Sequence, residues 1–276
     1  MVSVHNFSYG LLNPVLAYGM SALGAFLGLR CVILSRAYQG AAKARWLILA
    51  AVSIGAVGIW AMHFIAMLGF TIPGEPIRYN VPITVGSLLI SVAVVTIGSF
   101  IVGFGNGGWP RLIAGGAVIG VGVAAMHYMG MAATSMTGSM SYDLPLVALS
   151  VVIAIVAGTT ALWIGTWVSS VVATFGAALV MGVAVTGMHY TGMAALRVTG
   201  GLMPAVGIDG VSTVSGVSGA TAATFLIPLL LVISLATFLL TLSISMTPSE
   251  DEIRADTEMQ RRLRYLEQRG TPEHGA

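Results

Sequence analysis

The sequence contains little charge and a single cysteine. Asp, Glu, Lys and Arg make up 8% of its 276 residues, compared with about 25% in an ordinary soluble protein. This scarcity excludes a typical soluble domain, and the long apolar runs do not alternate with polar residues as the strands of a β-barrel would. Because Cys31 has no second cysteine to pair with, the chain can form neither an internal disulfide nor a multi-cysteine metal site.

Apolar runs occupy most of the chain, and hydrophobic residues make up 57% of it. Each run holds roughly 20 residues without charge, which is long enough for a helix to cross a hydrocarbon core of about 30 Å. The sequence therefore predicts an all-α membrane protein with seven transmembrane helices, in multiple passes through the plasma (inner) membrane. The expected spans cover residues 14–35, 46–70, 82–103, 111–134, 145–168, 173–196 and 222–246.

The basic residues predict how these spans are oriented. Arg36, Lys43 and Arg45 lie between the first two spans, and Arg111 opens the fourth. Because cytoplasmic loops carry an excess of Lys and Arg, we expect the N-terminus outside and the C-terminus in the cytoplasm. Residues 1–13 carry no Lys or Arg, so a cleaved signal peptide is not expected.

Two domains are expected from the change in composition near residue 246. Residues 1–246 form the membrane domain, and residues 247–276 form a short charged cytoplasmic tail, helical from about Pro248. The tail is either a solvated helix or a contact site for a cytoplasmic partner. Residues 197–221 are rich in Gly, Ser, Thr and Val, and are expected to form a flexible external loop.

One six-residue pattern occurs in three of the apolar runs. Each copy has a Met directly before a His and a second Met four residues after it. The histidines are 64 and 62 residues apart, the length of two spans and two loops, so the chain is interpreted as three helix pairs in one orientation plus one extra helix. The copies are Met62-His63-Phe64-Ile65-Ala66-Met67, Met126-His127-Tyr128-Met129-Gly130-Met131 and Met188-His189-Tyr190-Thr191-Gly192-Met193.

Helical spacing predicts which side chains of each copy share a face. A His and the Met four residues later diverge by only about 40° around the helix, whereas the Met before the His lies about 100° away. The position three residues after each His holds a small residue, Ala66, Gly130 or Gly192, which permits close helix approach. Gly116 and Gly120 form a further close-packing pair. If the three stripes face one centre, three imidazoles and three thioethers converge in the outer part of the membrane.

Imidazole and thioether ligands together favour a soft metal, and copper in particular. Zinc is less suited because the pattern contains no cysteine or carboxylate, and haem, held by two His or by His and Met, is a competing interpretation. Without a metal, these side chains would be packing residues of a structural helical bundle. The expected metal ligands are His63, His127, His189, Met67, Met131, Met193, Met62, Met126 and Met188.

Three further residues are candidates for supporting roles. Tyr128 and Tyr190 could orient an imidazole by hydrogen bonding, anchor the helix at the interface, or simply pack. The first copy has Phe64 at this position, so a hydroxyl is not needed in all three. His5 lies on the same outer side, where it is either an additional ligand or a solvated side chain.

At these residues the chain resembles the bacterial MHYT-domain family, whose name is the motif read at Met126-His127-Tyr128 and Met188-His189-Tyr190. The resemblance covers about residues 7–246 and implies an integral-membrane sensory domain. It also implies that the motif Met and His residues bind copper and that O₂, CO or NO is the sensed ligand. Many members carry cyclase, phosphodiesterase or kinase output domains, and we find none in this sequence, so the resemblance requires a separate cytoplasmic signalling partner.

The leading hypothesis is therefore a membrane sensor with a copper site near the outer leaflet. The alternative is copper handling, or electron transfer in an oxidase-like membrane protein. No catalytic residue is predicted. The expected partners are the lipid bilayer, a diatomic gas, a signalling protein and a second copy of the chain, but not nucleic acid.

Overall fold

The computed structural model describes residues 5–73, 76–105, 108–136, 139–199, 219–245, 255 and 258–265. Within these residues, seven helices are long and apolar enough to cross a membrane, which confirms the predicted number. The helical elements are α1 (Leu12–Ser35), α2 (Gly40–Val52), η1 (Ser53–Ala61), α3 (Met62–Met67), α4 (Val81–Gly103), α5 (Trp109–Ala132), α6 (Leu144–Trp167), α7 (Val171–Ala194), η2 (Ala222–Leu226) and α8 (Ile227–Ser245).

The second span is one continuous rod built from α2, η1 and α3. It begins at Gly40 rather than near residue 46 as predicted, because Lys43 and Arg45 lie inside the helix. The Lys43 ammonium lies 5.5 Å from the centre of the Phe104 ring, and such a cation–π contact lets a charged residue remain at the end of a span. Hydropathy alone ends the span at these charges.

Local capping explains where several helices begin and end. The Asn80 side chain accepts a hydrogen bond from the Ile83 N–H at the start of α4, and Ser170 caps α7 in the same way. The guanidinium of Arg36 donates to the carbonyl oxygens of Gly165 and Val168 at the end of α6. Each partner satisfies a backbone group that the helix itself leaves free.

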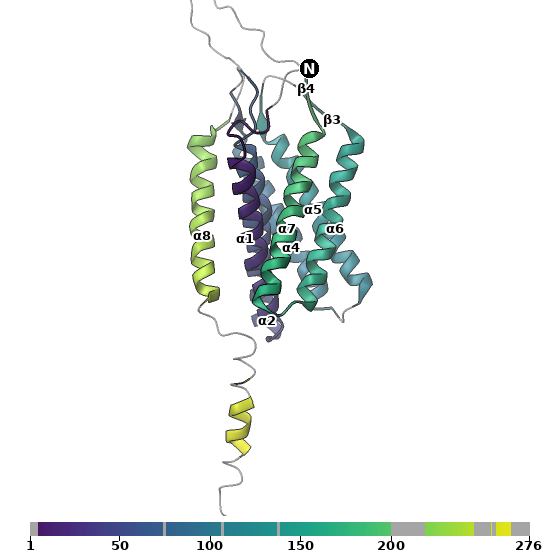
Figure 1. Ribbon diagram of the computed structural model, residues 1–276, viewed down its shortest axis with the longest axis vertical. Coiled ribbons are helices and arrows are strands. Elements are labelled where there is room, and N and C mark those ends of the chain that lie inside the picture. The colour runs from purple at the N-terminus through teal and green to yellow at the C-terminus, as the bar shows by residue number, and fades with distance from the viewer. Residues whose placement is uncertain are drawn as a thin grey trace, which may run out of the picture.

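Six of the spans pack into a closed ring around the bundle centre. Going around it, α1 packs against the second span, which packs against α4, and α5, α6 and α7 follow in order until α7 returns to α1. Helix α8 stands outside this ring beside η1 and α1, at one edge of the bundle in Figure 1.

Glycines allow the closest approaches in the ring. A Cβ added at Gly24 of α1 would meet the backbone of Gly58 in η1, and one added at Gly120 of α5 would meet the backbone of Ile155 in α6. The sequence expectation that Gly116 and Gly120 serve close packing is therefore confirmed for the contact between α5 and α6. Small residues at such crossings are the usual means of helix association in a membrane.

The second span contains a π-helical stretch, η1, immediately before His63. Within it, a Cβ at Gly55 would meet the backbone of α4, and the Gly55 carbonyl accepts a hydrogen bond of 2.8 Å from Ser91 Oγ. π-Helical turns are rare and occur frequently at functional sites. η1 leads directly into α3, which carries the first motif.

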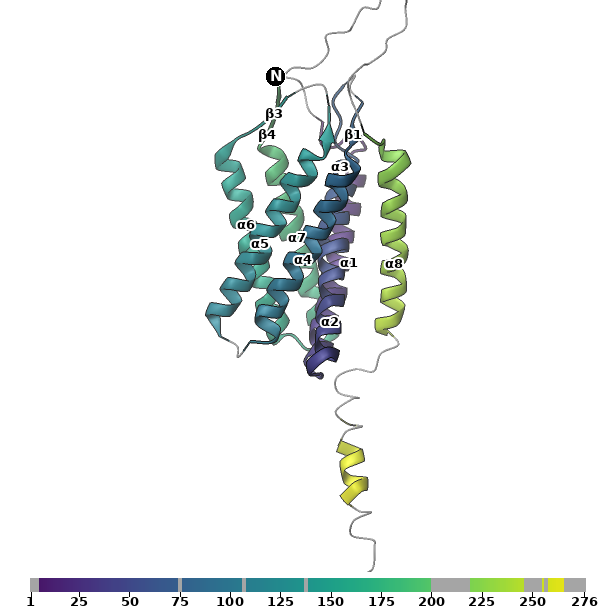
Figure 2. The same cartoon turned by 180° about the vertical axis from the view of Figure 1, so that it is seen from behind.

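Short strands connect the ends of the helices at the end of the bundle where the motifs lie, as Figures 1 and 2 show from opposite sides. Strand β1 (Arg78–Tyr79) pairs with β2 (Thr134–Ser135), and β3 (Ser139–Tyr142) pairs with β4 (Leu196–Thr199). An isolated bridge joins His5 to Thr71. In each case the segment after a motif helix pairs with the segment before another span.

Part of the sequence-based expectation falls outside the described residues. Residues 258–265 are helical. The expected helix start at Pro248 and most of the expected external loop at 197–221 are not among the residues that the structure describes.

Candidate metal centre

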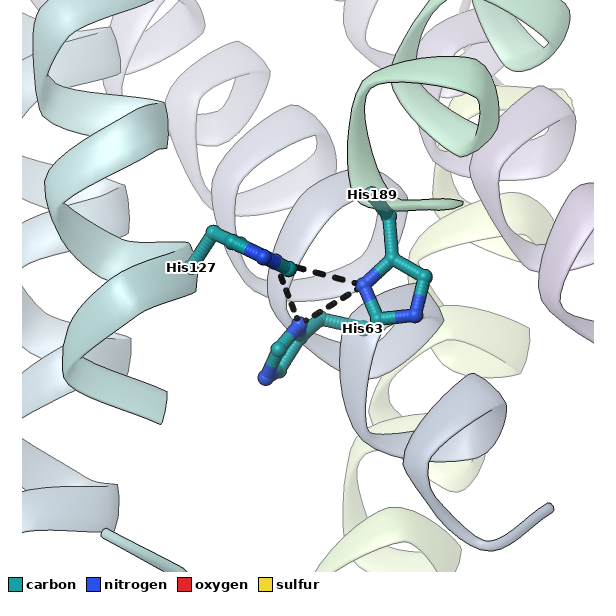
Figure 3. Close-up of side chains that lie close together, drawn as sticks. All are labelled: His63, His127 and His189. Carbon is teal, nitrogen blue, oxygen red and sulfur yellow. Dashed lines mark hydrogen bonds between the residues drawn. The ribbon is translucent and has the colours of Figure 1, made fainter. Parts of the chain in front are cut away.

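The three motif histidines meet at one point between the second span, α5 and α7 (Figure 3). Their Nδ1 atoms are separated by 3.0 Å between His63 and His189, 3.2 Å between His127 and His63, and 3.3 Å between His189 and His127. All three side chains are buried, with exposed fractions of 1%, 0% and 1% for His63, His127 and His189. The convergence expected from the repeat spacing is present in the structure.

Glycines in the motifs provide the space for two of the imidazoles. A Cβ added at Gly130 would meet Nε2 of His63, and one added at Gly192 would meet Nε2 of His127. Each of these imidazoles therefore lies against the helix that carries the next motif. The corresponding position of the first motif is Ala66, which is also buried.

The three Nδ1 atoms cannot satisfy one another with protons alone. An imidazole directs the Nδ1 lone pair to the centre only when its proton is on Nε2. One proton can form a hydrogen bond between only two of the three Nδ1 atoms. Without a cation, the lone pair of the third Nδ1 atom therefore faces a nitrogen to which it is not hydrogen-bonded. Nε2 of His63 and of His127 is buried without a hydrogen-bond partner among the residues that the structure describes. This donor set fits a cation better than a hydrogen-bonded network.

The size of the nitrogen triangle also fits a single small ion. The point equidistant from the three Nδ1 atoms lies roughly 1.8 Å from each of them, and metal–imidazole bonds are about 2.0–2.1 Å. An ion slightly to one side of the plane would therefore be at bonding distance from all three nitrogens. The three histidines can therefore act as the three ligands of one ion without movement of the helices.

The motif methionines fall into two sets. Met67, Met131 and Met193, the residues four positions after each His, belong to one buried cluster together with Phe70 and Leu196. The methionines that precede each His are also buried but are divided between two other clusters, with Met62 in one and Met126 and Met188 in the other. The first set shares a single layer of the core, as the 40° divergence predicts, and the second set does not.

An aromatic residue follows each His, and each of these rings contacts an aromatic residue from a segment that precedes a span. Ring centres are 6.1 Å apart for Phe64 and Tyr79, 5.4 Å for Tyr128 and Tyr142, and 5.4 Å for Tyr190 and Phe7. The sequence analysis missed Phe7, Tyr79 and Tyr142. The only signal was an aromatic residue 15 or 14 positions after the aromatic residue of the first two motifs.

Burial raises the pKa of Tyr79 to about 12 and raises the pKa of Tyr142, which Tyr128 raises further. Both phenols are therefore neutral at pH 7. They extend the apolar surroundings of the motif rings at this end of the bundle without adding negative charge.

The candidate supporting residues occupy different surroundings. The Tyr128 hydroxyl lies 2.8 Å from Ser150 Oγ on α6, whereas the Tyr190 hydroxyl is buried and has no hydrogen-bond partner in the described part of the chain. His5 is exposed, forms its bridge to Thr71 through the backbone, and is not one of the three clustered histidines.

The seven apolar helices and the buried trio define a multi-pass helical membrane protein with a candidate three-histidine metal centre. Residues 57–115 and 120–180 match the family model MHYT, described as a bacterial signalling protein N-terminal repeat. The matched segments contain His63 and His127. The chain belongs to the MHYT family of bacterial membrane signalling proteins.

Relatives with this similarity are longer signalling proteins. The bifunctional diguanylate cyclase/cyclic di-GMP phosphodiesterase MucR of Pseudomonas aeruginosa is 37% identical over 221 residues, which is 78% of this chain and 30% of MucR. An uncharacterized signaling protein of Caulobacter vibrioides is 33% identical over 67% of this chain and 22% of its own length. The cyclic di-GMP phosphodiesterase NbdA of P. aeruginosa is 41% identical over 50% of this chain and 18% of NbdA. This chain thus spans less than a third of each, and no solved structure matches it.

Proposed function

We propose that this protein is a sensor of the bacterial inner membrane whose three motif histidines hold a metal, most suitably copper. The observation that carries the proposal is the set of Nδ1 separations, 3.0–3.3 Å, at a buried point between three helices. Three lone pairs directed to one point are the donor arrangement of a metal site. A structural bundle would gain nothing from this arrangement, because it would leave an Nδ1 lone pair facing another nitrogen without a bond.

Copper is favoured over other metals by the residue types around the trio. Imidazole nitrogens are borderline ligands, and the thioethers of the layer formed by Met67, Met131 and Met193 are soft ligands that select Cu(I). Haem is disfavoured because two axial nitrogens around one iron must be about 4 Å apart with a macrocycle between them. The Nδ1 atoms here are closer together than that, in all three pairs.

Signalling requires that a ligand or redox change at the centre favours one helix arrangement over another. The bound metal would supply an open position for O₂, CO or NO, or a change of oxidation state. The protein supplies ligands from three different helices, so a change in the distances among the histidines shifts the second span, α5 and α7 relative to one another. The strand pairs link the ends of these helices to neighbouring spans. The curated names of MucR and NbdA support cyclic di-GMP metabolism as the output, through a partner protein or domain in the cytoplasm.

We further propose that the chain consists of three helix pairs plus α8, with the motif end of the bundle outside the cell. The recurrence of one pairing pattern supports the repeat, because the segments after α3, α5 and α7 each pair with a segment that precedes another span. The basic residues Lys43, Arg45 and Arg111 support the orientation, since they lie at the opposite end.

Metal analysis of the purified protein tests the proposal directly. We expect near-stoichiometric copper in the wild type, with nitrogen and sulfur ligands in the X-ray absorption spectrum, and loss of the metal in the triple variant His63→Ala, His127→Ala and His189→Ala. His5→Ala is the matched control and should retain the metal, because His5 lies outside the cluster.

Three results would change this conclusion. Equal metal content in the triple variant and the wild type would exclude the histidines as ligands. A strong Soret band would indicate haem instead of copper. If the spectrum of the bound copper does not change when O₂, CO or NO is added, copper handling or electron transfer would be favoured over gas sensing.

A further inference from the structure

A cavity lies at the end of the bundle opposite the histidines. Its volume is about 450 Å³, and it is an open cleft bordered by the end of α4, the start of α5 and the end of α6. Three indole rings, Trp109, Trp163 and Trp167, form much of the wall, and Arg111 is the charged residue that lines it. Along α5, Arg111 and His127 are separated by about 24 Å. The cavity is therefore remote from the metal centre and independent of it.

Arg111 presents a positive charge without a partner. It forms no ion pair or hydrogen bond with any residue that the structure describes, and its Nη1 lies beside Gly105 just beyond the end of α4. Arg111 is in the first turn of α5, where the free N–H groups of the helix already carry partial positive charge. The Arg111 side chain is exposed. Its charge and the free N–H groups of the helix together favour an anion at this position.

The surroundings of the cavity add positive charge and no negative charge. Lys43 contacts the ring of Phe104, the residue that precedes the lining residue Gly105. Within the described part of the membrane domain the carboxylate is Asp143, which is at the opposite end and pairs with Arg197 at 3.0 Å. An anion in the cavity would thus meet only attraction from the described ionic side chains.

The tryptophans identify the anion as that of a lipid. Their exposed fractions are 64%, 41% and 74% for Trp109, Trp163 and Trp167, so these large rings cover the rim rather than the protein core. Indole rings concentrate at the membrane–water interface, where one edge is apolar and the N–H faces polar groups. The cavity lies at the ends of three helices that are long and apolar enough to cross a membrane, where a spanning helix would meet lipid headgroups. Apolar walls and one guanidinium suit a phosphodiester that is attached to acyl chains.

We propose that this cavity binds the headgroup of an anionic phospholipid, with the lipid phosphate on the Arg111 guanidinium and the glycerol and upper acyl carbons against the indole rings. The guanidinium donates paired hydrogen bonds to phosphate oxygens. Basic pockets between transmembrane helices bind anionic headgroups by the same chemistry. The bound lipid joins α4, α5 and α6, and α5 carries His127.

Lipid retention in native mass spectrometry provides the test. Detergent-purified full-length protein is titrated with phosphatidylglycerol and, separately, with zwitterionic phosphatidylcholine. We expect the wild type to retain phosphatidylglycerol preferentially, and Arg111→Gln to reduce this retention about fivefold. The matched control is Arg45→Gln, which removes the same charge from the same end of the bundle but does not line the cavity.

A second variant tests the cavity wall without changing the charge of the protein. Trp167→Ala removes part of the wall and should also lower the retention of phosphatidylglycerol, while both variants keep the wild-type unfolding temperature and metal content. The proposal is wrong if Arg111→Gln retains as much lipid as the wild type, or if phosphatidylcholine is retained equally well. Displacement of the lipid by excess inorganic phosphate would overturn the lipid identity in favour of a soluble anion.

Discussion

Gly130 and Gly192 shape the candidate metal centre at the level of single residues as much as the histidines do. Each one leaves the space in which Nε2 of an imidazole from another helix lies. A methyl group at either position would push that imidazole away from the shared point. The small residue three positions after His is thus a steric requirement of the site rather than only a means of helix approach.

The substitution Gly192→Ala should therefore reduce metal affinity by roughly 10- to 100-fold, the usual effect of disturbing the support of a metal ligand. Metal retention during dialysis against a chelator measures this. Gly187→Ala is the matched control on the same helix, because a Cβ at Gly187 meets nothing within 4 Å. Since Ala is a better helix former than Gly by about 1 kcal/mol, the control should be neutral or slightly stabilised. Equal metal retention in both variants would contradict the steric role.

The sequence predicted that the histidines meet, because their regular spacing places them at a similar depth on alternate spans of the bundle. It could not predict that Nδ1 rather than Nε2 faces the centre, since this depends on the rotamer that Gly130 and Gly192 allow. Nor did it indicate Phe7, Tyr79 and Tyr142. These rings contact the motif through segments outside the spans, where no helical periodicity applies.

At the scale of helices, the contact between α5 and α6 depends on direct approach of their backbones. We expect Gly120→Ala to destabilise the protein by about 1–3 kcal/mol, because the added methyl group would overlap the Ile155 backbone and force the helices apart. The thermal unfolding midpoint in detergent should fall.

Gly176→Ala on α7 is the control for this change, since a Cβ there meets nothing within 4 Å. An unchanged midpoint for Gly120→Ala would mean that α6 can move without cost. The interpretation that α5 and α6 pack in direct backbone contact at Gly120 would then be wrong.

Hydropathy predicted the existence of the spans but neither η1 nor the strands. A π-helix uses the same apolar residues as an α-helix, and its wider turns arise here from tertiary contacts, with the backbones at Gly55 and Gly58 pressed against α4 and α1. The strands are only two to four residues long. They exist because helix packing brings their chain segments together, which a local pattern cannot reveal.

At the scale of the whole molecule, the proposed orientation can be checked by cysteine labelling in intact cells. The native Cys31 is buried and should remain unlabelled in the wild type. Ser139→Cys, in exposed β3 at the motif end, should react with a membrane-impermeant maleimide. Gln39→Cys, exposed at the opposite end, should react only after the cells are permeabilised. The reverse pattern would invert the topology and place the metal centre on the cytoplasmic side.

No single segment of this protein can make a complete binding pocket for an ion, because every nitrogen of the trio comes from a different helix. A shortened protein with one helix pair would contribute a single imidazole and would need three copies to regenerate the full set. Fusing all three donors into one polypeptide removes that dependence on concentration. The occupancy of the proposed centre would then depend on metal supply alone, even when the cell makes only a few molecules of the protein.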